Sequence, residues 1–70
     1  MITQIGLSDG SIVLTDRPLI EVIGLWMSNS HEGFKVAAVG HLYPEGSSAA
    51  LMLTWIRSEA VTFISEEVKP

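Results

Sequence analysis

Residues 49–56, AALMLTWI, constrain this chain more than any other feature. The run contains one polar side chain, whereas a strand with one face in water alternates apolar and polar residues. If it is extended, it places apolar side chains on two opposite faces: Met52 and Ile56 on one, and Leu51, Leu53 and Trp55 on the other. Both faces of such a strand must be buried by other residues, and a chain of 70 residues has few residues available for this.

Two further segments have the same two-sided character: 18–27, PLIEVIGLWM, and 34–42, FKVAAVGHL. In an extended 34–42, Phe34, Val36, Ala38 and Leu42 share one face, and Lys35, Ala37, Val39 and His41 share the other. A small sheet has one interior. Each large apolar side chain left in water forgoes about 1.5–3 kcal/mol, against a total stability of about 5–15 kcal/mol. We therefore predict that a second polypeptide, identical or different, covers the remaining surface.

The composition supports a partner. A chain this short buries only about 60% of its unfolded surface, and such domains lean on disulfides, metals or oligomerisation. There is no cysteine, which excludes disulfides and thiolate metal sites and leaves oligomerisation. Charged residues make up 17% of the chain, below the usual level of about 25%. A surface poor in charge is typical of a protein that works against a partner.

Turn signals divide the chain into segments of strand length. Asp9-Gly10, between MITQIGL and SIVLT, predicts a hairpin. Further breaks fall at 16–18, at 28–33 and at 43–48. We expect an all-β fold, a small antiparallel meander or barrel of five to six strands. In it, 18–27 and 34–42 pair as a hairpin, and two C-terminal strands are joined by a bend at Ser58-Glu59. Residues 1–66 form a single domain, and 67–70 form a short polar tail.

Two helical alternatives remain open. Apolar residues over 49–66 also follow a three- and four-residue spacing behind Ser48, a possible cap, and would give an α+β fold with a C-terminal helix. The branched residues of this segment favour strands instead. A shorter helix could begin after Asp16 as its cap, with Pro18 in the first turn.

Residues capable of chemistry do not form a recognisable motif. His31-Glu32 would need His41 or Glu45 to complete a metal site of three or four ligands, and it lacks the HExxH spacing. The serines fall mostly in turns, without a base and an orienting group. The carboxylates lack a chain long enough to form a deep cleft. We predict that the protein is not an enzyme and holds no metal or cofactor.

The tryptophans are the best binding candidates, because tryptophan is enriched where interfaces concentrate their binding energy. We predict a protein interface made by Trp26, Met27, Leu51, Leu53 and Trp55. The function predicted from these features is a non-enzymatic protein–protein interaction module. It self-associates as a homo-oligomer or serves as a small accessory or structural subunit or inhibitor, of a kind that bacteriophages encode.

The strand pattern from LSDGSIVLT to AVTFIS resembles an Sm-type short barrel. The resemblance implies an alternative function, that of a small oligomeric barrel that binds RNA or DNA. The charge balance disfavours nucleic acid, since 4 basic residues face 8 acidic ones and the net charge is −4. It equally disfavours anionic membranes. No apolar run approaches the length of about 18 residues that spans a bilayer, and the N-terminus does not resemble a signal peptide. We expect a cytoplasmic protein without a membrane partner.

Overall fold

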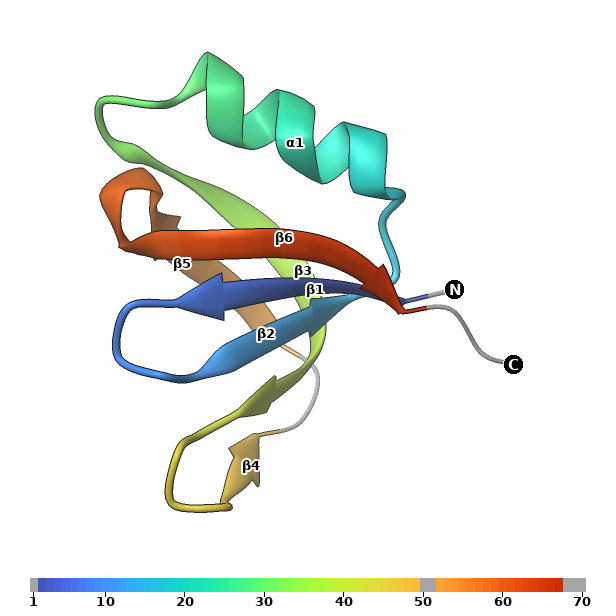
Figure 1. The fold of residues 1–70 in the computed structure, drawn as a ribbon. Helices are drawn as coiled ribbons and strands as arrows, with labels where there is room; N and C mark the ends of the chain where they lie inside the picture. Colours follow the sequence, from blue (N-terminus) through green and yellow to red (C-terminus); the bar gives the residue numbers. More distant parts are fainter. Residues whose placement is uncertain (1, 50–51, 68–70) are drawn as a thin grey trace.

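A computed structural model describes residues 2–49 and 52–67, which form one curled antiparallel sheet and one helix (Figure 1). The elements follow in the order β1 (Ile2–Leu7), β2 (Ile12–Thr15), α1 (Leu19–Ser28), β3 (Gly33–Leu42), β4 (Ser48–Ala49), β5 (Met52–Arg57), the 3-10 turn η1 (Ser58–Ala60) and β6 (Val61–Glu67). The prediction of a mostly β fold with five to six antiparallel strands is confirmed.

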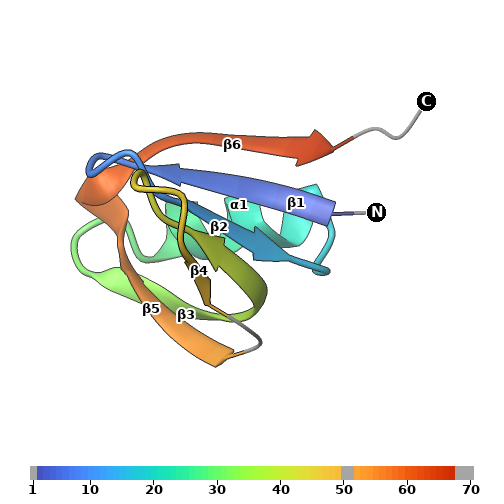
Figure 2. The same cartoon turned by 90° about the horizontal axis from the view of Figure 1, so that it is seen from below.

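The sheet has the strand order β4-β3-β2-β1-β6, and β5 pairs with β3 on the same side as β4. The last strand returns to β1 and does not continue beside β5, so the order departs from a simple meander. The sheet curls but does not close (Figure 2). Within the described residues, β5 and β6 each pair with one neighbour only, which leaves one edge of each without a strand.

The first hairpin turns as the Asp9-Gly10 pair predicts. The Leu7 N–H donates to the Ser11 carbonyl at 2.9 Å, and Gly10 lies at φ +89, in the left-handed region. Three-residue hairpin loops commonly need a glycine in this conformation, because it has no Cβ to clash. The loop at 44–46 is built in the same way, with Gly46 at φ +95.

The segment 18–27 corrects the sequence analysis. It forms α1, so the predicted hairpin of 18–27 with 34–42 is wrong, and the shorter helix is the alternative that applies. Asp16 is not its cap: Pro18 occupies the N-cap position, and its carbonyl accepts hydrogen bonds from the N–H groups of Glu21 and Val22. An apolar run of this length suits either structure by its pattern. A proline that cannot donate to a ladder, with apolar residues at helical spacing behind it, favours the helix.

Helix α1 lies across the open side of the curled sheet, between β6 and β3 (Figures 1 and 2). Its inner face carries Val22, which is fully buried, with Leu25 and Trp26 beside it. These side chains close a core drawn from the inner face of the sheet: Ile5, Val13, Phe34, Val36, Ala38 and Ile56. In the described part of the chain, no helix combines the length and apolarity needed to cross a bilayer.

Residues 52–67 form two strands, so the alternative of a C-terminal helix over 49–66 is wrong. The predicted bend at Ser58-Glu59 is confirmed as the turn η1. Branched side chains favour the extended form here, and pairing with β3 and β1 satisfies the backbone groups on one side of each strand. Strand β6 continues to Glu67, one residue into the predicted tail, and residues 68–70 lie outside the described part.

A bulge in β3 changes which residues of this strand face the core. The register runs from Leu14 opposite Gly40 to Thr15 opposite Ala38, so the stretch at Val39 carries an extra residue. Residues before the bulge alternate as predicted, with Phe34, Val36 and Ala38 buried. Beyond it the phase reverses, which leaves Leu42 exposed and His41 half-buried, contrary to the predicted faces.

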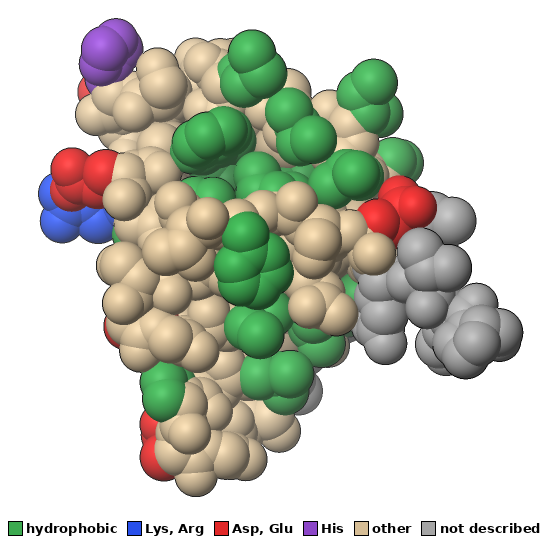
Figure 3. Space-filling model, viewed as in Figure 1, with side chains coloured by type: hydrophobic (Ala, Val, Ile, Leu, Met, Phe, Trp, Pro, Cys, Tyr) green, Lys and Arg blue, Asp and Glu red, His purple; other side chains and the backbone are tan. Residues whose placement is uncertain are grey.

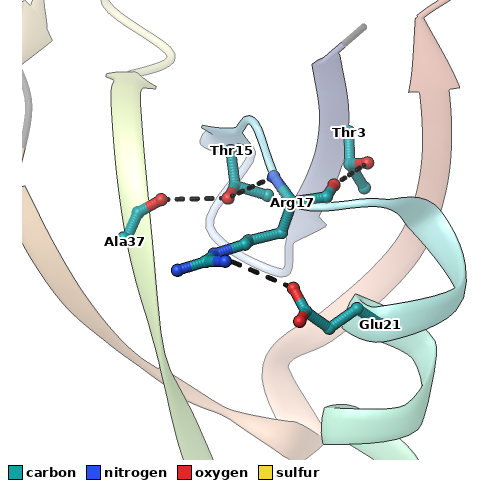
Figure 4. A network of polar contacts seen from close by, with 5 residues as sticks. All are labelled: Thr3, Thr15, Arg17, Glu21 and Ala37. Carbon is teal, nitrogen blue, oxygen red and sulfur yellow. Dashed lines mark hydrogen bonds and ion pairs between the residues drawn. The ribbon is translucent and has the colours of Figure 1, made fainter.

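Polar contacts fix the point where the chain leaves the sheet and enters α1 (Figure 4). The buried hydroxyl of Thr3 donates to the Arg17 carbonyl at 2.7 Å, and the buried hydroxyl of Thr15 donates to the Ala37 carbonyl at 2.9 Å. The Thr15 oxygen also accepts the Arg17 N–H at 3.2 Å, and Arg17 Nε lies 3.8 Å from Glu21 Oε2. The contacts tie β1, β2 and β3 to the start of the helix.

Candidate interaction surfaces

The predicted interface residues fall on two separate elements. Trp26 and Met27 belong to α1, whereas Leu53 and Trp55 belong to β5. Leu51 lies outside the described residues. The structure therefore divides the predicted interface into two surfaces, one on β5 and one between α1 and β6.

The first is the β5 surface, formed by Leu53, Trp55 and the unpaired edge of β5. Both side chains point away from the core, with Leu53 67% exposed and Trp55 54% exposed, while Ile56 of the same strand is buried. They lie opposite Ala37 and Lys35 of β3. A strand presents alternate residues to opposite faces, and in β5 both faces carry apolar residues, as the sequence indicates.

Trp55 is held in place by a close approach to the backbone. A Cβ added to Gly33 would lie 2.8 Å from Trp55 Cζ2 and would overlap the Ile56 carbonyl. Glycine is therefore required at position 33, where the ring covers the start of β3. Half of the indole remains in water, so it offers a rigid apolar contact with little conformational entropy to lose.

The second surface is the α1–β6 groove, lined by Ile23, Trp26 and residues 61–64. Trp26 is anchored in this groove by its indole N–H, which donates to the Ser58 carbonyl at 3.0 Å. Met27 stands outside Trp26 and is 67% exposed. Figure 3 shows the apolar side chains of the helix above, those of the sheet below, and a furrow between them.

Sequence reasoning missed Ile23 and Phe63, which line this groove. Phe63 is 45% exposed, and its ring lies over Gly6 of β1, where any Cβ would overlap it. The two residues were missed because 18–27 was interpreted as a strand. The spacing of Ile20, Ile23 and Met27, at three and four residues, is the signal of a helix face that the sheet does not cover.

The charged groups near these surfaces are largely paired or at the periphery. Arg57 Nη2 lies 2.8 Å from Glu59 Oε1, between β5 and η1.

In the loop at 8–10, hydrogen bonds from the Ser11 hydroxyl and N–H, at 2.6 and 2.8 Å, lower the pKa of Asp9 below its ordinary value. The Ser47 hydroxyl lowers the pKa of Glu45 in the same way.

The candidates for metal binding do not converge. His31 and Glu32 are exposed in the turn before β3, whereas His41 lies near the other end of that strand and stacks on Tyr43 at 4.3 Å. Among residues 2–49 and 52–67, no three His, Asp or Glu side chains are grouped so as to hold a metal ion.

No family model, no curated protein and no solved structure matches the chain. The geometry and chemistry of the two surfaces are therefore the basis for a functional proposal.

Proposed function

We propose that this chain is a non-enzymatic protein–protein interaction module that self-associates through the β5 surface. The observation that carries the proposal is the exposure of Leu53 and Trp55 on a strand whose second edge has no neighbour among the described residues. Burying two such side chains is worth about 1.5–3 kcal/mol each. An unpaired edge adds a row of backbone groups that a second strand can satisfy.

A second copy of the chain fits this edge better than it fits β6. Natural edge strands avoid unwanted pairing with charges, prolines or bulges, and β5 carries no charged residue before its last position, Arg57. Under a two-fold axis the two β5 strands pair antiparallel, the more stable arrangement. The two Arg57 side chains then lie at opposite ends, and the apolar side chains meet near the centre.

The surface that such a dimer requires is modest. A specific interface buries about 800 Å² of each partner, which is less than a fifth of the 4586 Å² that one copy exposes. The β5 edge with its outward side chains provides the apolar centre, and Lys35 and Arg57 lie at its polar rim.

Light scattering on the purified protein, from about 1 to 200 µM, tests the proposal. We expect a concentration-dependent dimer, and we expect Leu53→Lys to raise its dissociation constant at least about tenfold. Ile20→Lys, a matched change at a site that is 81% exposed on α1, should leave it unchanged. Circular dichroism checks that both variants fold. A wild-type protein that stays monomeric throughout the range contradicts the proposal.

Such a module would act in the cytoplasm as a small accessory or structural subunit or inhibitor, of the phage-encoded kind. RNA or DNA binding has weaker support. Nucleic-acid affinity depends on basic side chains that are free to neutralise phosphates, and Arg17 and Arg57 each face a glutamate. A salt-dependent gain of anisotropy with a labelled oligonucleotide would favour that alternative.

A further inference from the structure

The α1–β6 groove is lined by the backbone edge of a strand as well as by apolar side chains. Four consecutive residues, 61–64, line it. The ladder with β1 is irregular at Thr62, where the register shifts between Gly6 and Leu7. From Phe63 on, side chains of consecutive residues point to opposite faces of the sheet, so Phe63 and Ile64 can both border one groove where the edge of the strand faces it. The backbone of β6 is therefore part of the groove wall, together with Ile23 and Trp26 from the helix.

That backbone edge has no strand beside it. Within the described residues, β6 pairs only with β1, in the register that joins Ile5 to Ile64 and Gln4 to Ser65. In a strand, alternate N–H and C=O groups point to the two sides. The N–H and C=O groups of β6 that point away from β1 thus face the α1–β6 groove, whose opposite side is the apolar surface of α1.

We propose that the α1–β6 groove binds an extended segment of a partner protein, which adds as a strand to the edge of β6. Main-chain hydrogen bonds to β6 provide affinity, and every second side chain of the segment packs between Ile23 and Trp26 of α1. This site is independent of the β5 surface and does not require self-association.

The charges around the groove specify the chemistry of the segment. The lining residues are uncharged, and beyond them β6 carries Glu66 near its carboxyl end. At the other end, Arg57 and Glu59 neutralise each other. In Figure 3, acidic groups lie at the right-hand end of the furrow, and the basic groups on this face lie at the left edge against acidic ones. An occupant that complements this pattern is apolar at alternate positions and carries Lys or Arg at the end beside Glu66.

The direction of the segment follows from the same pattern. Antiparallel pairing is the more stable of the two ladders, so the amino end of the segment lies beside the carboxyl end of β6. The basic residue is therefore expected at the amino end. A segment with the basic residue at its carboxyl end, or with an acidic residue in its place, should bind more weakly.

The probe is a synthetic peptide of about seven residues, with lysine first and valine or isoleucine at every second position. In the variant Trp55→Phe, the remaining tryptophan is Trp26, which borders the groove, so its fluorescence reports binding. We expect saturable binding below about 1 mM and a loss of about tenfold when glutamate replaces the lysine. Glu66→Lys should reverse that preference.

Methylated peptides separate strand addition from simple apolar contact. One peptide carries N-methyl groups on the odd-numbered amides and another on the even-numbered amides. A strand that pairs on one side only uses one of these sets, so one peptide should bind at least about tenfold more weakly and the other nearly unchanged. Equal binding by both would overturn strand addition.

Two substitutions locate the site. Ile23→Lys, within the groove, should abolish the fluorescence change, and Ile20→Lys, on the same helix but outside the lining, should preserve it. Circular dichroism confirms that each variant folds. If no peptide changes the Trp26 emission or the amide resonances of residues 61–66 at about 1 mM, the proposal is wrong. Leu53→Lys should leave peptide binding intact. Peptide binding and self-association can therefore fail or succeed independently in these experiments.

Discussion

Thr15 shows how one buried hydroxyl can hold several elements together. Its side chain is fully buried, donates to the Ala37 carbonyl and accepts the Arg17 N–H (Figure 4). Replacing it with valine keeps the shape and leaves both partners without a hydrogen bond. We expect Thr15→Val to lower the free energy of unfolding by about 1–3 kcal/mol, measured by urea denaturation. A change within experimental error would show that water satisfies the two backbone groups.

Thr54 on β5 is the opposite case. Its hydroxyl oxygen is buried and has no hydrogen-bond partner among the described residues. Valine has nearly the same shape and removes an unsatisfied polar group. We expect Thr54→Val to raise the unfolding free energy by about 1 kcal/mol in the same urea experiment. Destabilisation of similar size would mean that the hydroxyl is hydrogen-bonded in solution.

The loop carboxylates predict how stability depends on pH. Hydrogen bonds from Ser11 and Ser47 lower the pKa values of Asp9 and Glu45 in the folded state. A lowered pKa contributes stability above the pKa of the unfolded chain, and this contribution disappears as pH falls through the folded value. We expect the melting temperature to fall below about pH 4, and Asp9→Asn to reduce that fall. An equal fall in the variant would assign the effect to other groups.

At the level of single residues, the sequence predicted the local chemistry best where a turn required it. Asp9-Gly10 predicted the first hairpin because few residues other than glycine accept the left-handed conformation there. The inward and outward positions of β5 also followed from alternation. The partial burial of His41 depends on a bulge near Val39. Gly40 signals a bulge in this strand, but a glycine alone does not predict which residues face the core beyond it.

At the level of elements, helix α1 contains a glycine that makes it less stable than an alanine would. Gly24 is exposed in the middle of the helix, and a Cβ added there would meet no atom within 4 Å. Alanine is preferred over glycine inside helices by about 1 kcal/mol. We expect Gly24→Ala to raise the unfolding free energy by about that amount in urea. The matched change Gly33→Ala should lower it, since that Cβ would overlap the Ile56 carbonyl.

The nature of 18–27 was the main element that sequence reasoning assigned wrongly. Apolar residues occupy nearly every position of PLIEVIGLWM, so the three- and four-residue spacing of Ile20, Ile23 and Met27 is present together with a two-residue alternation. The tertiary structure decides between them, because the segment packs as a helix over the curled sheet and contacts both β6 and β3. The C-terminal strands were predicted correctly because their branched residues and the Ser58-Glu59 bend agree.

At the level of the whole molecule, the helix reduces the amount of apolar surface that needs a partner. The sequence suggests three two-sided strands, whereas α1 takes one of these segments and buries Val22 in the core. Among the described residues, part of the apolar surface that remains lies at the two unpaired edges of the sheet, with Leu53 and Trp55 on β5 and Phe63 on β6, and the rest lies on α1 and on β3. The edge of β5 has no charged residue before Arg57, whereas β6 carries Glu66 near its end. For this reason we assign a second copy of the chain to β5 and an extended segment with a basic residue to β6.

Hydrogen–deuterium exchange of the wild-type protein, at two concentrations that differ about a hundredfold, is the most direct test of self-association through β5. We predict that the outward-facing amides of residues 52–57 exchange more slowly at the higher concentration, while those of residues 61–66 exchange at the same rate. If the amides of β5 exchange equally at both concentrations, or if β6 is the strand that becomes protected, the β5 surface is not where copies of this chain meet.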